Sequence, residues 1–363
     1  MKKIRLTLFV LFFLNKTFAQ RNNTWISFWN KDSTLIGFKD KTGKIKIEPK
    51  FTRLNNAQRF DKIIGVEEEK DGKLISYYLT KSGKVIGQNN LYIFDNGADC
   101  ESEGFIRFRD RKTHKVGMYS SRGDLAIPAD YDNLMPVRNG MVMALKGGRW
   151  DISQQSEHNQ FPWVGSKSVL IDIHNKVLID NFQWDENIDF YSLVISDHLN
   201  KNSVRQNYRG TTGKYYSFIN FDKEFEAWLK DSLLNNLSKA NLEKISYGNI
   251  IVWNKGKSWT KESKENFLAN NFEIVKSKLI EVSQPNCDYI VTTEGLDPNI
   301  FDTTESEKYF NNCGYPKDWA YPVKMIVINH KVNNNILQDQ ISFLRTAKGY
   351  KLIELSFKVG EPL

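Results

Sequence analysis

The chain has 363 residues, which predicts about two domains and is too long for a small disulfide-stapled scaffold. Its 40% hydrophobic and 26% charged residues are typical of a folded protein and exclude a disordered or collagen-like chain. The formal net charge of +8 raises the question of a nucleic-acid partner, so the position of the basic residues matters.

The first twenty residues have the pattern of a secretory signal peptide. Basic residues between Lys2 and Arg5 precede an apolar run over residues 6–14, and Ala19 is the small residue expected before a cleavage site. The run is too short to span a bilayer and no later stretch reaches the necessary length, so no transmembrane span is expected. We predict that residues 1–19 are removed and that the mature chain is exported as a soluble periplasmic or extracellular protein.

Cleavage would remove part of the positive charge. The remaining chain has 47 basic and 43 acidic residues, a net charge of +4. No stripe of lysine and arginine is left in the sequence that could follow a phosphate backbone. Nucleic acid is therefore not expected as a partner.

The chain has an odd number of cysteines, which leaves at least one unpaired in an oxidising compartment: Cys100, Cys287 and Cys313. Cys287 and Cys313 are the only pair close in sequence, and a disulfide between them is one interpretation. Three buried, unreactive thiols are the other, because spacing alone does not define the geometry that a disulfide needs. The sequence has no CxxC, HExxH or Cys/His cluster, so neither a metal nor a cofactor is expected.

A 40-residue period organises the first half of the chain. Gly43, Gly83 and Gly123 recur at this spacing, each between two short runs of alternating apolar residues. Glycine supplies the positive φ that closes a short hairpin turn, and Asn175, in a fourth and degenerate unit, is the next residue type to tolerate it. We predict a β-rich hairpin-repeat array over residues 20–215, with units near 35–74, 75–114, 115–152 and 167–190.

The repeat resembles the WG-repeat family over about residues 30–185. The resemblance rests on the turn Asp40–Lys44 and on the segment Ile127–Asp132, which reads Ile-Pro-Ala-Asp-Tyr-Asp. Ile36-Gly37 and Val116-Gly117 stand where the family has a Trp-Gly step. The resemblance implies a β-hairpin array that acts as a binding or scaffolding surface, and it implies no catalytic residues.

Two prolines follow the hairpin turns of the first and third units. Pro49 and Pro128 lie about six residues after the turn glycines, and we expect them to end the second strand of the hairpin.

The pattern changes after about residue 213, and we predict a C-terminal α+β domain over residues 216–363. Apolar residues at helical spacing predict one amphipathic helix from Asp222 to Ala240, with Asp222 as its N-cap. A strand is expected over 245–253, a short helix near 261–270 and extended chain over 272–282.

Three further strands are predicted at the end of the chain, over residues 323–331, 336–346 and 350–358, with turn-forming residues between them. This order of elements fits helices packed on a curved antiparallel sheet. It resembles the nuclear-transport-factor-two-like fold, which implies a cone-shaped sheet whose mouth can hold a ligand.

Four side chains are candidate ligand contacts. His158 and Trp163 lie in an insertion of the fourth repeat unit, where long loops of repeat arrays often carry contacts. Trp319 and Tyr321 belong to an aromatic group that would line a cavity of the C-terminal domain. The alternative for each is an ordinary packing residue of a loop or a core.

The sequence favours a binding protein over an enzyme. It has no nucleophile elbow, kinase signature or dinucleotide fingerprint, and its five histidines are scattered. We expect a secreted, non-enzymatic interaction protein that binds a protein or an envelope glycan through its β-repeat scaffold. The alternatives are a periplasmic hydrolase of carbohydrate or peptidoglycan with the repeats as its targeting module, since paired carboxylates leave no local motif, and a purely structural envelope component.

Overall fold

The computed structural model describes residues 24–154, 162–254, 258–302, 304–333 and 335–358, and the predicted signal peptide at residues 1–19 lies outside them. The described chain is strongly β-rich and divides into two compact units. The first unit holds the described residues up to Trp184 together with 210–212 and 311–315, and the second holds the rest. Within the described residues, no helix has the length and apolar character needed to cross a membrane.

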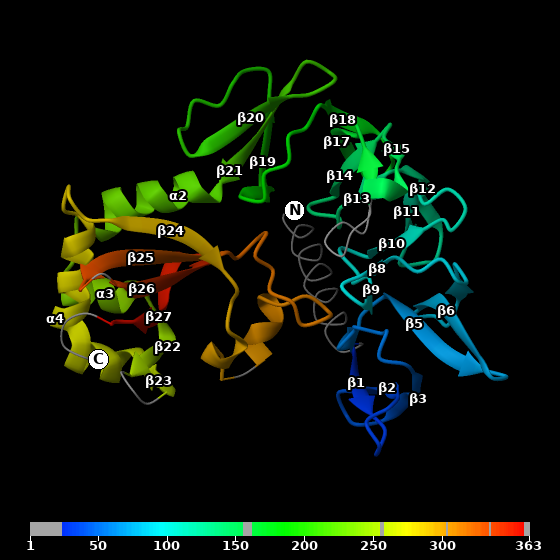
Figure 1. The fold of residues 1–363 in the computed structure, drawn as a ribbon, viewed down its shortest axis with the longest axis horizontal. Helices are drawn as coiled ribbons and strands as arrows, with labels where there is room; N and C mark the ends of the chain where they lie inside the picture. Colours follow the sequence, from blue (N-terminus) through cyan, green and yellow to red (C-terminus); the bar gives the residue numbers. More distant parts are fainter. Residues whose placement is uncertain (1–23, 155–161, 255–257, 303, 334, 359–363) are drawn as a thin grey trace, which may run out of the picture. The chain divides into compact units, whose positions relative to one another are not determined.

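The first unit contains four successive three-stranded meanders (Figure 1). Their strands are β1 (Trp25–Trp29), β2 (Ile36–Asp40) and β3 (Ile45–Phe51); β5 (Ile63–Lys70), β6 (Lys73–Thr80) and β7 (Val85–Ile86); β10 (Phe105–Arg109), β11 (Val116–Ser120) and β12 (Leu125–Tyr131); and β14 (Met141–Lys146), β17 (Lys167–Asp172) and β18 (Val177–Asp180). The short strands β4 (Arg59–Phe60), β8 (Ile93–Phe94), β9 (Gly97–Ala98), β13 (Asn133–Leu134), β15 (Arg149–Trp150) and β16 (Trp163–Val164) and the turn η1 (Ile152–Gln154) connect or extend them.

The hairpin turn has the same hydrogen bonds in all four meanders. The N–H of the turn residue donates to the carbonyl three residues earlier at 2.8–3.0 Å, and its φ is positive, in Gly43, Gly83, Gly123 and Asn175. At the start of the first and fourth turns, an aspartate side chain also accepts backbone N–H bonds, as Asp40 does from Thr42 and Lys44. The repeated sequence pattern therefore corresponds to a repeated turn structure.

Pro49 and Pro128 lie inside β3 and β12 rather than ending them, which corrects the sequence prediction. The register of both hairpins shifts near the proline, and a bulge accommodates a residue that has no N–H to donate. The bulged strand comes so close that a Cβ on Gly37 would lie 2.6 Å from the Ile47 carbonyl oxygen, and Gly117 is equally crowded. Glycine is required there for close approach of the backbone.

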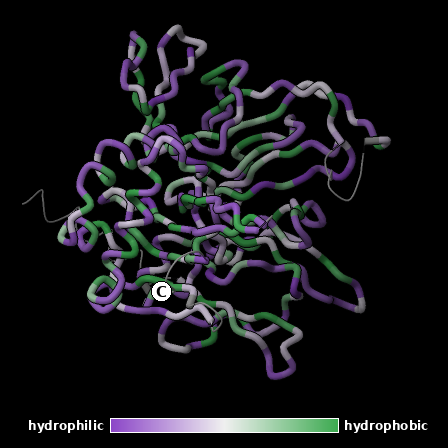
Figure 2. The backbone as a smooth tube through the Cα atoms, turned by 60° about the vertical axis from the view of Figure 1, so that its left-hand side comes forward, coloured by the Kyte–Doolittle hydropathy of each residue, from purple (hydrophilic) through white to green (hydrophobic). Residues whose placement is uncertain are grey.

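Hydrophobic and hydrophilic residues are interspersed along the chain (Figure 2). Buried side chains of the repeats form small separate cores, each shared by two neighbouring meanders. Phe38, Phe51 and Phe60 are fully buried in the core that the first two meanders share. This arrangement is expected of a repeat architecture, in which each repeat packs on its neighbours.

A disulfide joins Cys100 to Cys313, and Cys287 is a free thiol. Both interpretations offered by the sequence, a disulfide between Cys287 and Cys313 and three free thiols, are therefore wrong. The bonded cysteines are 213 residues apart in sequence, and both belong to the first compact unit. Two cysteines form a disulfide when the fold brings their Cβ atoms close together, and proximity in sequence does not determine this.

The second unit contains a three-stranded sheet and a six-stranded sheet. The first has the order β19-β21-β20, and the second has the order β23-β22-β27-β26-β25-β24. Their bounds are β19 (Ile188–Ser196), β20 (Arg205–Arg209), β21 (Tyr215–Asn220), β22 (Ser246–Asn254), β23 (Ser258–Ser263), β24 (Tyr289–Glu294), β25 (Val323–Val332), β26 (Asn335–Thr346) and β27 (Gly349–Ser356). Because β22 runs parallel to β27, the larger sheet is mixed and not purely antiparallel as predicted.

Helices pack on the six-stranded sheet through one shared apolar core (Figure 1). They are α2 (Phe221–Trp228), the π-helical turn η2 (Leu229–Leu233), α3 (Lys239–Ile245) and α4 (Lys264–Val282). Two short 3-10 turns, η3 (Pro298–Ile300) and η4 (Thr304–Lys308), lie between β24 and β25. The strongly β-rich fold is thus confirmed, and the α-helices among the described residues belong to this unit.

Two helix predictions need correction. The helix predicted from Asp222 to Ala240 is shorter, because the α-helix α2 ends at Trp228. Its N-cap is Asn220, whose side chain accepts a hydrogen bond from the Lys223 N–H at 3.1 Å. The predicted extended chain over 272–282 is the second half of α4, in which Val275, Leu279 and Val282 are buried at helical spacing.

Candidate binding site

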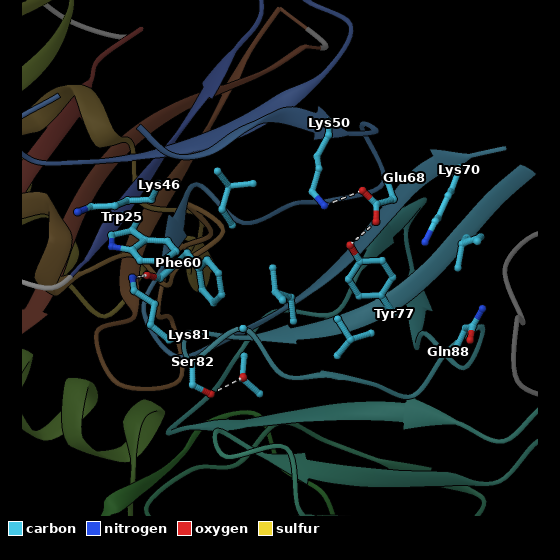
Figure 3. A pocket seen from close by; sticks show the side chains of 16 residues that line it. Trp25, Lys46, Lys50, Phe60, Glu68, Lys70, Tyr77, Lys81, Ser82 and Gln88 are labelled. Atoms are coloured by element: carbon cyan, nitrogen blue, oxygen red, sulfur yellow. Dashed lines mark hydrogen bonds and ion pairs between the residues drawn. The ribbon is translucent and has the colours of Figure 1, made fainter. Parts of the chain in front are cut away.

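The first two meanders enclose a pocket of about 650 Å³ (Figure 3). The sheet order places β3 beside β5, but these strands pair only at Phe51 and Glu68 and diverge beyond that point. The divergence leaves a cleft whose walls come from β3 on one side and from β5 and β6 on the other. We call it the lysine pocket, after the residues described next.

Four lysines and one carboxylate line the lysine pocket: Lys46, Lys50, Lys70, Lys81 and Glu68. Lys50 forms an ion pair with Glu68 at 2.8 Å, and Lys46 pairs with an aspartate of the hairpin turn at 3.0 Å. Within the described part of the chain, neither Lys70 nor Lys81 forms an ion pair with a carboxylate. The lining therefore has an excess of positive charge.

Glu68 is held in its ionised form between two donors. Lys50 donates from one side, and the hydroxyl of Tyr77 donates to Oε1 at 2.7 Å (Figure 3). Burial opposes ionisation, but these bonds and the nearby charge of Lys70 outweigh it and lower the pKa of Glu68. Burial and the adjacent carboxylate raise the pKa of Tyr77, so its hydroxyl remains a neutral donor. This arrangement fixes Lys50 in position.

Lys81 lies at one end of the lysine pocket, against aromatic rings. Its ammonium is 4.0 Å from the centroid of Trp25 and 4.9 Å from that of Phe60, and it donates to the Phe60 carbonyl oxygen. Burial lowers the pKa of Lys81 to about 8, although the charges of Asp61 and Glu101 oppose this effect. Lys81 is therefore mostly cationic at neutral pH.

Between the charged groups, the lining is largely aliphatic, with Thr80, Ser82 and Gln88 as its uncharged polar residues. Ile47, Ile75 and Leu79 are partly exposed to the lysine pocket, and Val85, at the edge of the sheet, is 56% exposed. Chemically, the pocket offers ammonium donors above an aliphatic surface, which suits an anion that also carries an apolar group.

Two segments of the repeats are similar to a known family. Residues 36–62 and 117–150 match the family model of the WG containing repeat. The matched segments begin at β2 and at the second residue of β11, in the first and third meanders, whose hairpins have a glycine and a proline at a bulge. No curated protein and no solved structure matches the chain. The resemblance of the C-terminal part to the nuclear-transport-factor-two-like fold stays a prediction.

The first matched segment provides one wall of the lysine pocket, and the three candidate contacts among the described residues, Trp163, Trp319 and Tyr321, do not line it. His158 lies outside the described residues. Trp163 lies on β16, 5.1 Å from Trp150 in a T-shaped contact, with the Lys115 ammonium 4.0 Å above its ring. Trp163 therefore packs within the insertion of the repeats.

Trp319 and Tyr321 belong to the second compact unit. Tyr321 packs against Tyr309 with ring centroids 5.0 Å apart, at the edge of an apolar cluster, and Trp319 is partly buried in a turn. These residues are separate from Trp163, which lies in the first unit.

Sequence reasoning missed the residues of the lysine pocket. Within one hairpin, Lys46 and Lys50 look like ordinary exposed strand residues, and Lys70 lies at the tip of the next hairpin. A signal is present in their position relative to the repeat, because they flank the junction between the first and second meanders.

A pH dependence of stability is expected from Glu101, whose charge acts on Lys81. Its Oε2 accepts the N–H groups of Lys62 and Ile63 at 3.1 and 3.3 Å, yet burial raises its pKa to about 7. The folded protein therefore binds this proton more tightly than the unfolded chain. The free energy of unfolding should fall by about 2 kcal/mol as the pH rises from 4.5 to 7. Urea titrations of the wild type and E101Q measure this slope, and an equal slope in both would contradict the assignment to Glu101.

Proposed function

We propose that this chain is a secreted, non-enzymatic binding protein whose β-repeat scaffold presents the lysine pocket to a partner. The proposal rests on one observation: a single cleft combines cationic side chains with an apolar surface. Two of these cations have no carboxylate partner among the described residues. The Cys100–Cys313 disulfide and the signal-peptide pattern support export.

The repeat array itself supports a scaffolding role. The family model matches the first and third meanders, and all four share the hydrogen bonds of the hairpin turn. We therefore propose that the WG-like array extends over about residues 30–185, and that the helices and mixed sheet of the second unit form an α+β domain. Repeat arrays commonly place binding surfaces where units meet, as at the lysine pocket.

The hydrolase alternative is less well supported by this site. Glycoside hydrolysis needs two carboxylates that face each other across the cleaved bond. Glu68 is the one acidic side chain among the described residues that line the lysine pocket, and it is bound to Lys50 and Tyr77. Its lowered pKa suits a fixed negative charge better than proton donation.

The test compares two double variants that remove equal charge. K50Q/K70Q removes two lysines of the lysine pocket, and K44Q/K73Q removes two lysines of the same hairpins that do not line it. We expect the mature chain to be retained on immobilised polyglutamate or polygalacturonate and K50Q/K70Q to elute at clearly lower salt, with K44Q/K73Q close to the wild type. Equal shifts in both variants, or no retention of the wild type on either polymer, would contradict the proposal.

A further inference from the structure

We infer that the lysine pocket recognises an acidic peptide segment in which carboxylate and aliphatic side chains alternate. The inference rests on the proposed binding function and names the class of its ligand. It follows from three features of the pocket: where its charges lie, what its floor is made of, and how its aromatic side chains are already engaged.

The charges are placed at both ends of the lysine pocket. Lys81 lies at one end, with its ammonium over the ring of Trp25, Lys70 lies toward the other end, and Lys50, bonded to Glu68 at 2.8 Å, lies between them (Figure 3). Lys70 lines the same cleft without a carboxylate partner among the described residues. Separate ammonium groups match several carboxylates spaced along a chain better than one compact anion.

The floor between these charges is aliphatic. Ile47, Ile75, Leu79 and Val85 line the cleft and are at least partly exposed. Valine or leucine side chains of a peptide would be removed from water against this surface, which is favourable. The hydroxyl groups of a sugar would lose hydrogen bonds to water over this aliphatic surface. Of the uncharged polar lining residues, Thr80 and Ser82 already bond each other at 2.9 Å.

The aromatic side chains offer little open surface for a sugar ring. Lys81 lies over the ring of Trp25 at 4.0 Å, and Phe60 meets the same indole in a T-shaped contact with centroids 5.4 Å apart. Tyr77 is 5% exposed, and its hydroxyl is bonded to Glu68. The observations therefore favour a peptide over an acidic glycan.

The inference is tested with labelled eight-residue peptides and fluorescence anisotropy on the mature full-length chain. The probe alternates Glu with Val; one analogue replaces Glu by Gln, and another replaces Val by Ser. We expect the Glu-Val peptide to bind about 10-fold more tightly than either analogue, because each analogue removes one of the two recognised features. We also expect K50Q/K70Q to weaken binding about 10-fold and K44Q/K73Q less than 2-fold.

A second variant addresses the floor without removing charge. V85S changes a side chain that is 56% exposed at the sheet edge and should leave folding unchanged. It should weaken the Glu-Val peptide about threefold and leave the Glu-Ser peptide unaffected.

The outcomes separate this inference from the proposed function. Equal affinity for the Glu-Val and Glu-Ser peptides, or no effect of K50Q/K70Q beyond that of K44Q/K73Q, would overturn the inference. Tighter, K50Q/K70Q-sensitive binding of oligogalacturonate would also overturn it, while leaving the pocket as a binding site. Failure of every anionic probe to bind would remove the proposed function as well.

Discussion

Removing the disulfide between Cys100 and Cys313 should lower the thermal midpoint of the first compact unit by about 10 °C. The cross-link closes a loop of 213 residues in the unfolded chain, and the chain-entropy model gives such a loop about 5 kcal/mol of stabilisation. Backbone bonds offset part of the loss, because the N–H groups of Gln58 and Arg59 both donate to the Asn312 carbonyl oxygen at 2.9 Å. We therefore expect a net loss of about 3–4 kcal/mol.

Thermal unfolding of C100S/C313S, followed by circular dichroism, measures this effect. C287S is the matched control, because Cys287 is a free, partly buried thiol of the second unit. Its midpoint should lie close to that of the wild type, and wild-type protein treated with a reductant should approach the double variant. Midpoints of C100S/C313S and C287S that agree within error would show that the disulfide does not support the folded state.

Local structure of the repeats was predictable because it depends on residues close in sequence. A glycine or asparagine at a positive φ, with a hydrogen-bonding residue three positions earlier, specifies the hairpin turn wherever it occurs. Part of this pattern recurs in Thr212-Gly213-Lys214, which repeats the order of residues 42–44, and Gly213 has a φ of +82° in the turn between β20 and β21, although Gly210 stands three positions earlier. This turn was missed although its signal was present, because the change of composition nearby suggested a domain boundary.

The extent of α4 shows a different kind of prediction error. The stretch 272–282 contains scattered apolar residues that suit either a strand or a helix. Val275, Leu279 and Val282 are spaced by four and three residues, and this spacing places all three in the core below the six-stranded sheet. The helical spacing of apolar residues is thus present in the sequence, but it continues beyond residue 270, where the predicted short helix ended.

The lysine pocket could not be predicted from the sequence in the same way. It exists because β3 and β5, neighbours in one sheet, pair at Phe51 and Glu68 and then separate, and the point of separation depends on how the strands of that sheet twist. Lys46 and Lys70 line the same cleft although they belong to different hairpins. Likewise, the partner of Cys313 follows from the placement of distant segments in the first unit.

In the second unit, Lys324 and Asp222 should respond very unequally to mutation. Lys324 lies on β25 and is fully buried, and its ammonium donates to Asp222 Oδ1 at 2.5 Å, to Thr293 Oγ1 at 2.6 Å and to Asn187 Oδ1 at 3.1 Å. The side chain of Asp222 is 58% exposed. Removing the carboxylate in D222A leaves a buried cation with neutral partners alone, which should cost about 3 kcal/mol.

The opposite change, K324M, should cost less than about 1 kcal/mol. Methionine fills the volume of the lysine stem without burying a charge, and Asp222 remains hydrated because it is mostly exposed. Urea denaturation of the full chain, followed by tryptophan fluorescence, gives both values. A loss in K324M as large as in D222A would show that the ion pair itself is the main source of stability.

The double variant D222A/K324M distinguishes the cost of a buried charge from the value of the pair. Once Lys324 is replaced, no cation remains to be neutralised, so the added D222A change should have little further effect beyond the loss of an acidic residue in the first turn of α2. The double variant is therefore expected to be more stable than D222A alone. If it is less stable than the wild type by the sum of the two single losses, the two side chains act independently and the buried ammonium does not depend on Asp222.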